Sequence, residues 1–400
     1  MQEIGMLTNF NKPTELAKMT SLVAKAYGME LIYMRPKDIN IEEKKVYGKV
    51  LVNNKWVDKT TDIPPFIDAA PYCFMRKNKE KMDFLRKTTF LSDNRRNVVT
   101  KEMLQNTLSK DEQFSHLMIP THKIKSFQDM DSYLHDYQKI VLKPGKGLRG
   151  KGIYIIEKKD NDLFTIGFNK EKWDADVNAL EEFFDNTVRG KNYILQKYVT
   201  SRTPQGDPFD CRVHVEKDGT GKWAVAKIYV RIGIGQSVIS NVNQGGGISD
   251  PKEFLKANFN RQHEEIYQNL LKLGTQIPKK MEQLRGTHIM SLGLDIGIDT
   301  NGKLYLFEVN DGPSTKAVIS EVAFLRSNYY LYVLENRLNR KVKVKVKDST
   351  DELENNQKEI RELKEMIAEK EKQLNSILNS KSWKLTGVMR KARRKMTKKK

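Results

Sequence analysis

The sequence predicts an α/β protein whose 400 residues form two folded parts and a charged C-terminal extension. An apolar strand, a helix and a second apolar strand follow one another within residues 4–36, the order of a parallel α/β unit. Residues 292–313 alternate apolar and polar side chains around Asn301-Gly302, and Asn-Gly is the strongest short-range signal for a β-hairpin. Heptad spacing of apolar residues begins only at Leu353.

The two folded parts are predicted to cover residues 1–80 and 81–340. The first contains the α/β unit and, at 46–58, a hairpin that turns at an Asn-Asn pair. In the second, we expect helices near 127–138, 175–189, 251–285 and 313–340, and strands at 139–144, 153–158, 193–199, 211–217, 222–232 and on both sides of Asn301-Gly302.

The extension divides into a predicted coiled coil, residues 341–380, and a basic tail, residues 381–400. The heptad a and d positions hold Leu353, Ile360, Leu363, Ile367, Leu374 and Ile377. A two-stranded coiled coil would make the protein a homodimer, and a single charged helix folded against the body is the alternative.

Composition excludes several classes of protein. The first residues lack the basic start and apolar run of a signal peptide, and no apolar stretch is long enough to span a membrane. Two distant cysteines and six scattered histidines fit neither a disulfide framework nor a zinc site. The sequence therefore predicts a cytoplasmic protein.

The net charge of +20 is concentrated at the C-terminus, because residues 381–400 hold ten Lys or Arg and no acidic residue. The body shows no basic face with interleaved aromatics, so nucleic acid is not the expected partner. Apolar residues such as Trp383 among the basic ones suit an anionic inner membrane face. A disordered, solubilising tail is the alternative.

The hairpin at 292–313 predicts a metal site. If Asn301 and Gly302 form the loop, Asp295 lies directly opposite Glu308, and Asn310 shares their face. Opposed carboxylates repel one another, and the glycines on either side of Asp295 leave open space. Two carboxylates and an amide are oxygen donors that suit Mg²⁺. An exposed face with an accidental acidic pair is the alternative.

Three other stretches carry groups that suit a phosphate ligand. Lys143 ends a strand and precedes GKGLRGKG, residues 145–152, whose glycines (Gly147 and Gly150 among them) would let backbone N–H groups approach a polyphosphate. Arg212 and Arg231, on successive strands, could bind phosphate or carboxylate oxygens. Each stretch alone also fits an ordinary turn or surface strand.

The order of these features resembles the ATP-grasp superfamily: Lys, Gly-rich loop, hinge strand YILQKYV, Arg, Asn with Gly-Gly, and finally Asp-(12)-Glu-x-Asn. The resemblance covers roughly residues 85–335 and is closest to the YheC/YheD branch, the endospore coat-associated proteins. It implies an α+β ATP-grasp core of two subdomains, preceded by a pre-ATP-grasp domain.

The resemblance assigns roles to individual residues. Lys143 and Lys101 would contact phosphates, Gln196 the adenine edge, and Asp207 the ribose, while Lys197 and Val199 would offer backbone contacts to the base. Arg212, Arg231 and Asn241 would face the γ-phosphate and the acyl intermediate. Asp295, Glu308 and Asn310 would hold two Mg²⁺ ions, for which Mn²⁺ could substitute.

The activity implied is ATP-dependent ligation, in which a carboxylate is phosphorylated to an acyl phosphate that an amine or thiol then attacks. The alternatives are an ATP-grasp kinase and a non-catalytic component of a spore coat or surface polysaccharide. The tail is similar to the ends of some surface-polysaccharide glycosyltransferases, which suggests a cell-envelope polymer or its lipid-linked precursor as acceptor.

Overall fold

The computed structural model describes residues 1–145, 152–159, 162–168, 171–233 and 246–342, together with 359, 362–373 and 376. The chain separates into two units, Met1–Val344 and Lys345–Lys400. In the second unit residues 362–373 are helical, but most of the predicted coiled coil and the whole basic tail lie outside the described residues, so a coiled coil is not shown. Among the described residues, no helix combines the length and apolar character needed to cross a bilayer.

The N-terminal part is built on a mixed sheet whose centre is parallel, as the strand–helix–strand pattern predicts. Its strands are β1 (Gln2–Leu7), β2 (Met29–Met34), β3 (Ile39–Asn40), β4 (Lys45–Val52), β5 (Lys55–Asp62), β6 (Phe66–Ala69) and β7 (Phe90–Leu91). The order is β3-β4-β2-β1-β6-β7, with β5 paired to β4. β1 pairs in parallel with β2 and β6, and β6 with β7.

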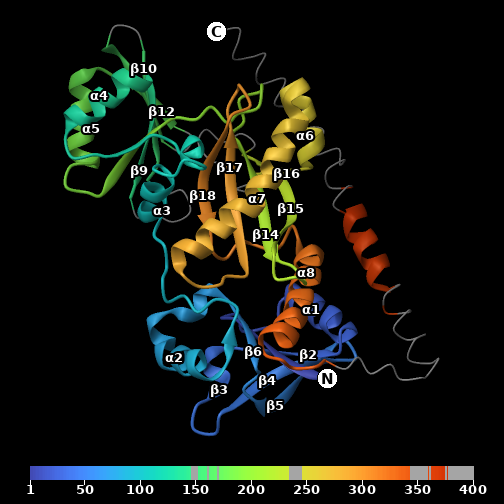
Figure 1. The fold of residues 1–400 in the computed structure, drawn as a ribbon. Coiled ribbons are helices and arrows are strands. Elements are labelled where there is room, and N and C mark those ends of the chain that lie inside the picture. The colour runs from blue at the N-terminus through green and yellow to red at the C-terminus, as the bar shows by residue number, and fades with distance from the viewer. Residues whose placement is uncertain are drawn as a thin grey trace. The chain divides into compact units, whose positions relative to one another are not determined.

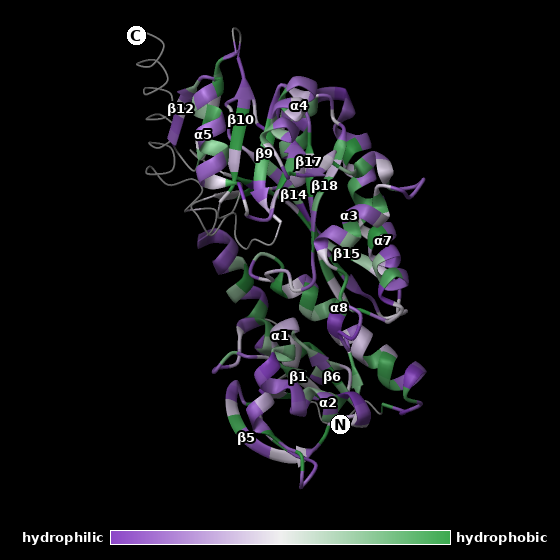
Figure 2. Ribbon diagram, turned by 90° about the vertical axis from the view of Figure 1, so that its left-hand side faces the viewer, coloured by the Kyte–Doolittle hydropathy of each residue, from purple (hydrophilic) through white to green (hydrophobic). Residues whose placement is uncertain are grey.

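Side-chain alternation along β1 buries both faces of this sheet. Ile4 and Met6 pack against α1 (Glu15–Ala26), whereas Leu7 packs on the opposite face against α2 (Lys79–Thr88). The predicted turn at Asn53-Asn54 is confirmed, since both residues adopt positive φ between β4 and β5, as a type I′ turn requires. Figure 2 shows β5 as largely hydrophilic, in keeping with its mostly exposed residues.

A second sheet has helices on one face. Its strands are β8 (Thr121–Lys123), β9 (Lys139–Pro144), β10 (Tyr154–Lys158), β11 (Phe164–Phe168), β12 (Glu171–Ala175) and β13 (Tyr193–Lys197), in the order β12-β11-β10-β9-β13-β8. Figure 1 shows α4 (Phe127–Tyr137) and α5 (Val177–Thr187) beside this sheet. The apolar side chains of β9 and β13 pack on these two helices. β11 and β12 were not expected from the sequence.

The third sheet is antiparallel and carries most of the predicted site. Its strands are β14 (Phe209–Lys217), β15 (Trp223–Ile232), β16 (Gly247–Ser249), β17 (Ser291–Ile298) and β18 (Leu304–Asn310), in the order β16-β15-β14-β17-β18. One face packs against α6 (Pro251–Phe259) and α7 (His263–Arg285), and α3 (Lys101–Leu108) contributes Leu108 to the same core (Figure 1). The expected single helix at 251–285 is wrong, because Asn260, at positive φ, separates α6 from α7.

The last helix of the first unit connects the N-terminal sheet to the third sheet. α8 (Ile319–Tyr332) continues into a π-helical turn, Val333–Arg337, and Tyr330 is buried in the core beside β1 and β2. From α8, Arg326 reaches Glu216 of β14 (Nη2–Oε1, 3.0 Å) and Asp68 of β6 (Nη1–Oδ2, 3.1 Å). These contacts join the two sheets through buried charge.

Candidate functional site

The site is built on the polar face of the third sheet. Along β14, Cys211, Val213 and Val215 face the core beneath α7, which leaves Arg212 and His214 on the opposite face. β17 follows the same alternation, so that Asp295 lies beside Arg212 in register. Both side chains are buried, at 7% and 6% exposure, so each charge needs a partner within the protein.

The hairpin register confirms that Asp295 lies opposite Glu308 and that Asn310 follows on β18. The predicted two-residue loop is wrong. Asp299 pairs with Lys303, and Gly302, at φ +81°, closes a three-residue loop. A β-bulge beside Asp295 shifts the register by one residue and compensates for the longer loop.

The open space expected at the two glycines flanking Asp295 is also absent. A Cβ on Gly293 would lie 2.7 Å from Pro313 Cβ, and a Cβ on Gly297 would lie 2.0 Å from the Phe307 ring. Glycine is therefore required at both positions because neighbouring side chains already occupy that space.

Asp295 is held by two arginines and one amide. The Arg212 guanidinium binds it with two nitrogens, and Arg231 Nη2 lies 3.0 Å from Oδ2. Asn310 Nδ2 donates to the same oxygen at 3.1 Å. Arg231 also makes two hydrogen bonds to Asp210, at 2.6 and 2.8 Å. Burial would lower the pKa of Arg231, but Asp210 and Asp295 raise it above its ordinary value. Both guanidinium planes are thus fixed.

The face of the second sheet opposite α4 and α5 contributes Lys143 and Gln196. Lys143 Nζ donates to Gln196 Oε1 at 2.8 Å, and Gln196 Nε2 donates to Thr121 Oγ1 at 3.0 Å. Thr121 in turn donates to the carbonyl of Ile119 at 2.8 Å. This chain of hydrogen bonds orients the Gln196 amide so that its oxygen faces the lysine.

Lys101 and Glu308 form an ion pair close to Lys143. Lys101, the first residue of α3, places Nζ 2.5 Å from Glu308 Oε1. Desolvation and the nearby Lys101 charge lower the pKa of Lys143 to about 8, while Glu308 opposes this shift. One cluster therefore forms from residues of α3, β9 and the β17–β18 hairpin. Its members are Lys101, Lys143, Asp295 and Glu308.

Three of the remaining predicted residues, Lys197, Val199 and Asp207, lie in the described part of the chain. Lys197 donates its backbone N–H to the carbonyl of Pro120 at 3.0 Å, and its ammonium lies 5.7 Å from the centre of the Tyr137 ring. The Val199 carbonyl accepts a hydrogen bond from Ser201 N, and Asp207 lies in the loop before β14, where its N–H donates to Thr203 Oγ1. Gly147, Gly150 and Asn241 lie outside the described residues.

The donor set fits a hard divalent cation. No group of three or more His, Cys, Asp or Glu with metal-site spacing occurs in the described part of the chain. A cation here would rest on the carboxylates of Asp295 and Glu308, the Asn310 amide oxygen and oxygens from water and phosphate, which is the mixed coordination that Mg²⁺ commonly adopts. The Lys101 ammonium adds a positive charge beside Glu308.

Sequence reasoning missed Asp210, which fixes Arg231, and Thr121, which orients Gln196. A signal for the first exists: FDCRVHVEK alternates polar and apolar residues, which places Asp210, Arg212, His214 and Glu216 on one face. No comparable local signal marks Thr121, because its partner lies 75 residues away.

Curated proteins with similar sequences include two from one organism. YheD of Bacillus subtilis (strain 168), an endospore coat-associated protein, is 26% identical over 287 residues, which are 69% of this chain and 62% of YheD. YheC of the same organism is 23% identical over 319 residues, 76% of this chain and 85% of YheC. This chain thus spans about three fifths of the length of YheD.

Among solved structures, the ATP-grasp ligase PsnB, complexed with a phosphomimetic variant of a minimal precursor, Mg and ADP, aligns with a TM-score of 0.47 and 12% identity, over 81% of this chain and 97% of PsnB. The model of the family described as YheC/D-like ATP-grasp matches residues 90–335, more than half of the sequence. The chain belongs to the YheC/D-like ATP-grasp family.

Proposed function

We propose that this protein is an ADP-forming ligase that uses Mg-ATP to activate a carboxylate for attack by an amine or a thiol. One observation supports this above the others: Lys101, Lys143, Arg212 and Arg231 converge on Asp295 and Glu308. Four cations lie beside three carboxylates, Asp210 included, and this excess of positive charge suits the binding of a polyphosphate with its metal and the stabilisation of charge that develops during phosphoryl transfer.

The residues of the chain have separate tasks in this reaction. Lys143, half-buried and hydrogen-bonded to Gln196, neutralises phosphate charge. Arg212 and Arg231, fixed by Asp295 and Asp210, present their other N–H groups to the γ-phosphate and to the oxyanion of the tetrahedral intermediate. Mg²⁺, when bound, supplies Lewis-acid stabilisation of the transferring phosphoryl group.

The bonds formed and broken balance without a nucleophilic side chain. A carboxylate oxygen of the substrate attacks the γ-phosphorus, and the bond to the β–γ bridging oxygen breaks to release ADP. The amine or thiol then attacks the acyl carbon, inorganic phosphate leaves with the bonding electrons, and the nucleophile loses its proton.

We place the acceptor at the cell envelope. The curated names of YheC and YheD associate both with the endospore coat, a surface layer. Residues 381–400 hold ten basic residues and no acidic one. This positive charge would attract an anionic polymer or lipid-linked precursor.

The test is nucleotide turnover by wild type and Glu308→Gln, with amino acids and anionic envelope precursors added and ADP and AMP resolved. We expect acceptor-dependent ADP that falls at least about 100-fold in the variant, because a residue that holds the metal is lost. The matched control is Glu321→Gln, since Glu321 also pairs with a lysine (Lys227, 2.8 Å) at nearly equal exposure, 32% against 33% for Glu308.

Hydroxylamine added during turnover distinguishes the ligase from a kinase, because it converts an acyl phosphate to a hydroxamate. Hydroxamate together with ADP supports the ligase. ADP with a stable phosphorylated product indicates a kinase, and AMP indicates adenylation. No turnover with any acceptor, together with ATP binding that Glu308→Gln leaves unchanged, would favour a non-catalytic role.

A further inference from the structure

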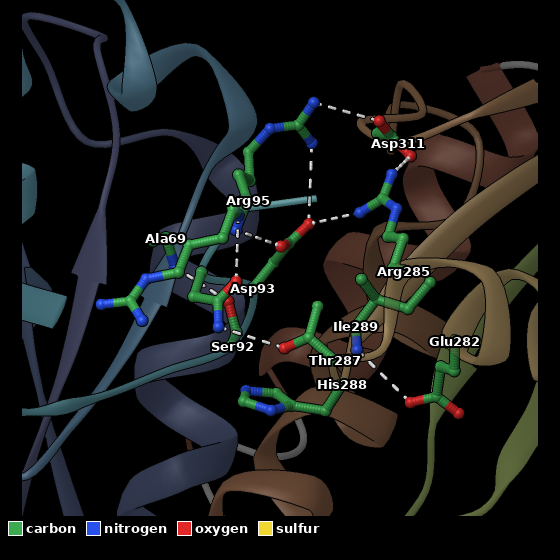
Figure 3. Close-up of polar contacts among 12 residues, drawn as sticks. Ala69, Ser92, Asp93, Arg95, Glu282, Arg285, Thr287, His288, Ile289 and Asp311 are labelled. Carbon is green, nitrogen blue, oxygen red and sulfur yellow. Dashed lines mark hydrogen bonds and ion pairs between the residues drawn. The ribbon is translucent and has the colours of Figure 1, made fainter. Parts of the chain in front are cut away.

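Two arginines and two aspartates form a closed ring beside the candidate site. Arg285 at the end of α7 binds Asp93 (Nη1–Oδ2, 2.8 Å) and Asp311. Arg95 binds Asp311 (Nη2–Oδ2, 3.1 Å) and lies 3.6 Å from Asp93 Oδ2 through Nη1. Figure 3 shows the four side chains alternating in charge around the ring.

The ring lies at a junction where residues 90–97 attach to the end of α7. The His288 ring stacks on Phe90, with centroids 4.5 Å apart, and contacts the Leu91 carbonyl through Nε2 at 2.5 Å. Asn94 donates to Thr287 Oγ1 at 3.1 Å and Asn97 to the Arg285 carbonyl at 2.9 Å. Residues 90–97 therefore have a defined path from the N-terminal sheet toward α3.

Two segments leave this ring and meet again at the candidate site. Lys101 follows Arg95 by six residues, and Glu308 precedes Asp311 by three, with Asn310 next to Asp311. Lys101 and Glu308 are themselves an ion pair. The ring consequently restrains, from one side, both partners of this pair and the amide that binds Asp295.

Charge and backbone geometry both indicate that the ring sets position. Arg285 is 1% exposed, and its Nε, like Arg95 Nη1, has no hydrogen-bond partner among the described residues. Arg95 also has φ +50°, a conformation that non-glycine residues rarely adopt. Well-packed apolar residues commonly stabilise a fold as much as a buried ion pair does, so what a charged ring adds is directional geometry.

We propose that Arg95 and Arg285 are positioning residues that fix Glu308 and Asn310 for cation binding, through Asp311 on one side and the 93–101 segment on the other. The inference rests on the proposed Mg-ATP site, because it concerns the strength of that site. Residues that orient metal ligands typically contribute about 10–100-fold to metal affinity.

The experiment measures the Mg²⁺ concentration at which saturating ATP gives half of its maximal rise in melting temperature, on the full chain. For Arg95→Ala we expect this concentration to increase about tenfold. Arg95→Lys, which keeps the charge, should recover part of the loss. Asp311→Asn, which keeps the side-chain shape, should also increase this Mg²⁺ concentration. It replaces Arg95→Ala as the test variant if Arg95→Ala does not fold.

The control is Arg35→Ala, which breaks a bidentate pair with Asp38 in the same N-terminal part, at 21% and 15% exposure. It should leave the Mg²⁺ dependence unchanged. Arg95→Ala and Asp311→Asn with wild-type Mg²⁺ dependence, or an equal rise in Arg35→Ala, would overturn the inference. Wild type that ATP and Mg²⁺ do not stabilise would instead contradict the proposed function.

Discussion

Lys143→Met should weaken ATP binding about 10- to 100-fold at pH 7, since a hydrogen bond to a charged group contributes about 1.5–3 kcal/mol. Lys143 is hydrogen-bonded to Gln196 and close enough to Lys101 and Glu308 for their charges to shift its pKa. The variant without ATP should be at least as stable as wild type, because a desolvated charge is removed. Calorimetric titration with ATP and a thermal melt measure the two effects.

The matched control is Lys139→Met on the same strand, where Lys139 pairs with Glu157 at 3.0 Å. It should bind ATP as wild type does. Equal losses in both variants would indicate a general effect of charge and not a phosphate contact.

The lowered pKa of Lys143, about 8, gives the same residue a pH signature. Below that pH the ammonium is charged in the free protein. Above it, ATP binding must take up a proton, so affinity should fall by up to about tenfold per pH unit. Lys143→Arg, whose guanidinium stays charged, should show no such fall. A flat wild-type profile between about pH 7 and pH 9.5 would contradict this assignment.

Arg326→Ala should lower the free energy of unfolding by about 3–5 kcal/mol, because it leaves Glu216 and Asp68 as uncompensated buried charges. Glu216 accepts two hydrogen bonds from Arg326, at 3.1 and 3.0 Å, and one from Ser291 at 2.8 Å. Urea unfolding followed by circular dichroism measures the change. Arg189→Ala, which breaks an exposed pair with Asp185, should cost at most about 0.5 kcal/mol.

The deficit in Arg326→Ala should depend on pH. Burial would raise the pKa of Glu216, but Arg326 and His214 lower it in the wild type. In the wild type this stabilisation is present above the unfolded pKa, about 4.5, and is lost as pH falls through the lower folded pKa. In the variant Glu216 keeps His214 and Ser291 as partners but loses the guanidinium that stabilises its charged form, so the difference should shrink in acid, where the carboxyl is protonated in both proteins. A pH-independent difference would contradict this explanation.

Local patterns predicted a large part of the fold and of the site. The Asn-Asn turn and the opposition of Asp295 and Glu308 follow from turn chemistry and strand alternation, which act over a few residues. The opposition of Asp295 and Glu308 was predicted correctly although the loop length was not. The β-bulge beside Asp295 compensates for the additional loop residue. Lys143, Arg212 and Arg231 were each a weak signal alone. Their order along the chain indicated that they belong to one site.

Features that depend on tertiary packing could not be predicted in this way. Asp93 and Arg95 carry no local sign of their role, because their partners lie about 190–220 residues away. The pairing of α8 with the N-terminal sheet is equally non-local, since Arg326 and Asp68 are 258 residues apart. Charged residues in such a segment resemble an ordinary solvated surface until the fold buries them.

The most direct test of the central claim, that four distant segments form one metal–nucleotide site, is calorimetric titration of ATP into the wild-type protein with Mg²⁺ and with EDTA. We predict one ATP bound per chain, with affinity at least about tenfold higher when Mg²⁺ is present. Absence of binding, or the same affinity with and without Mg²⁺, would contradict the claim.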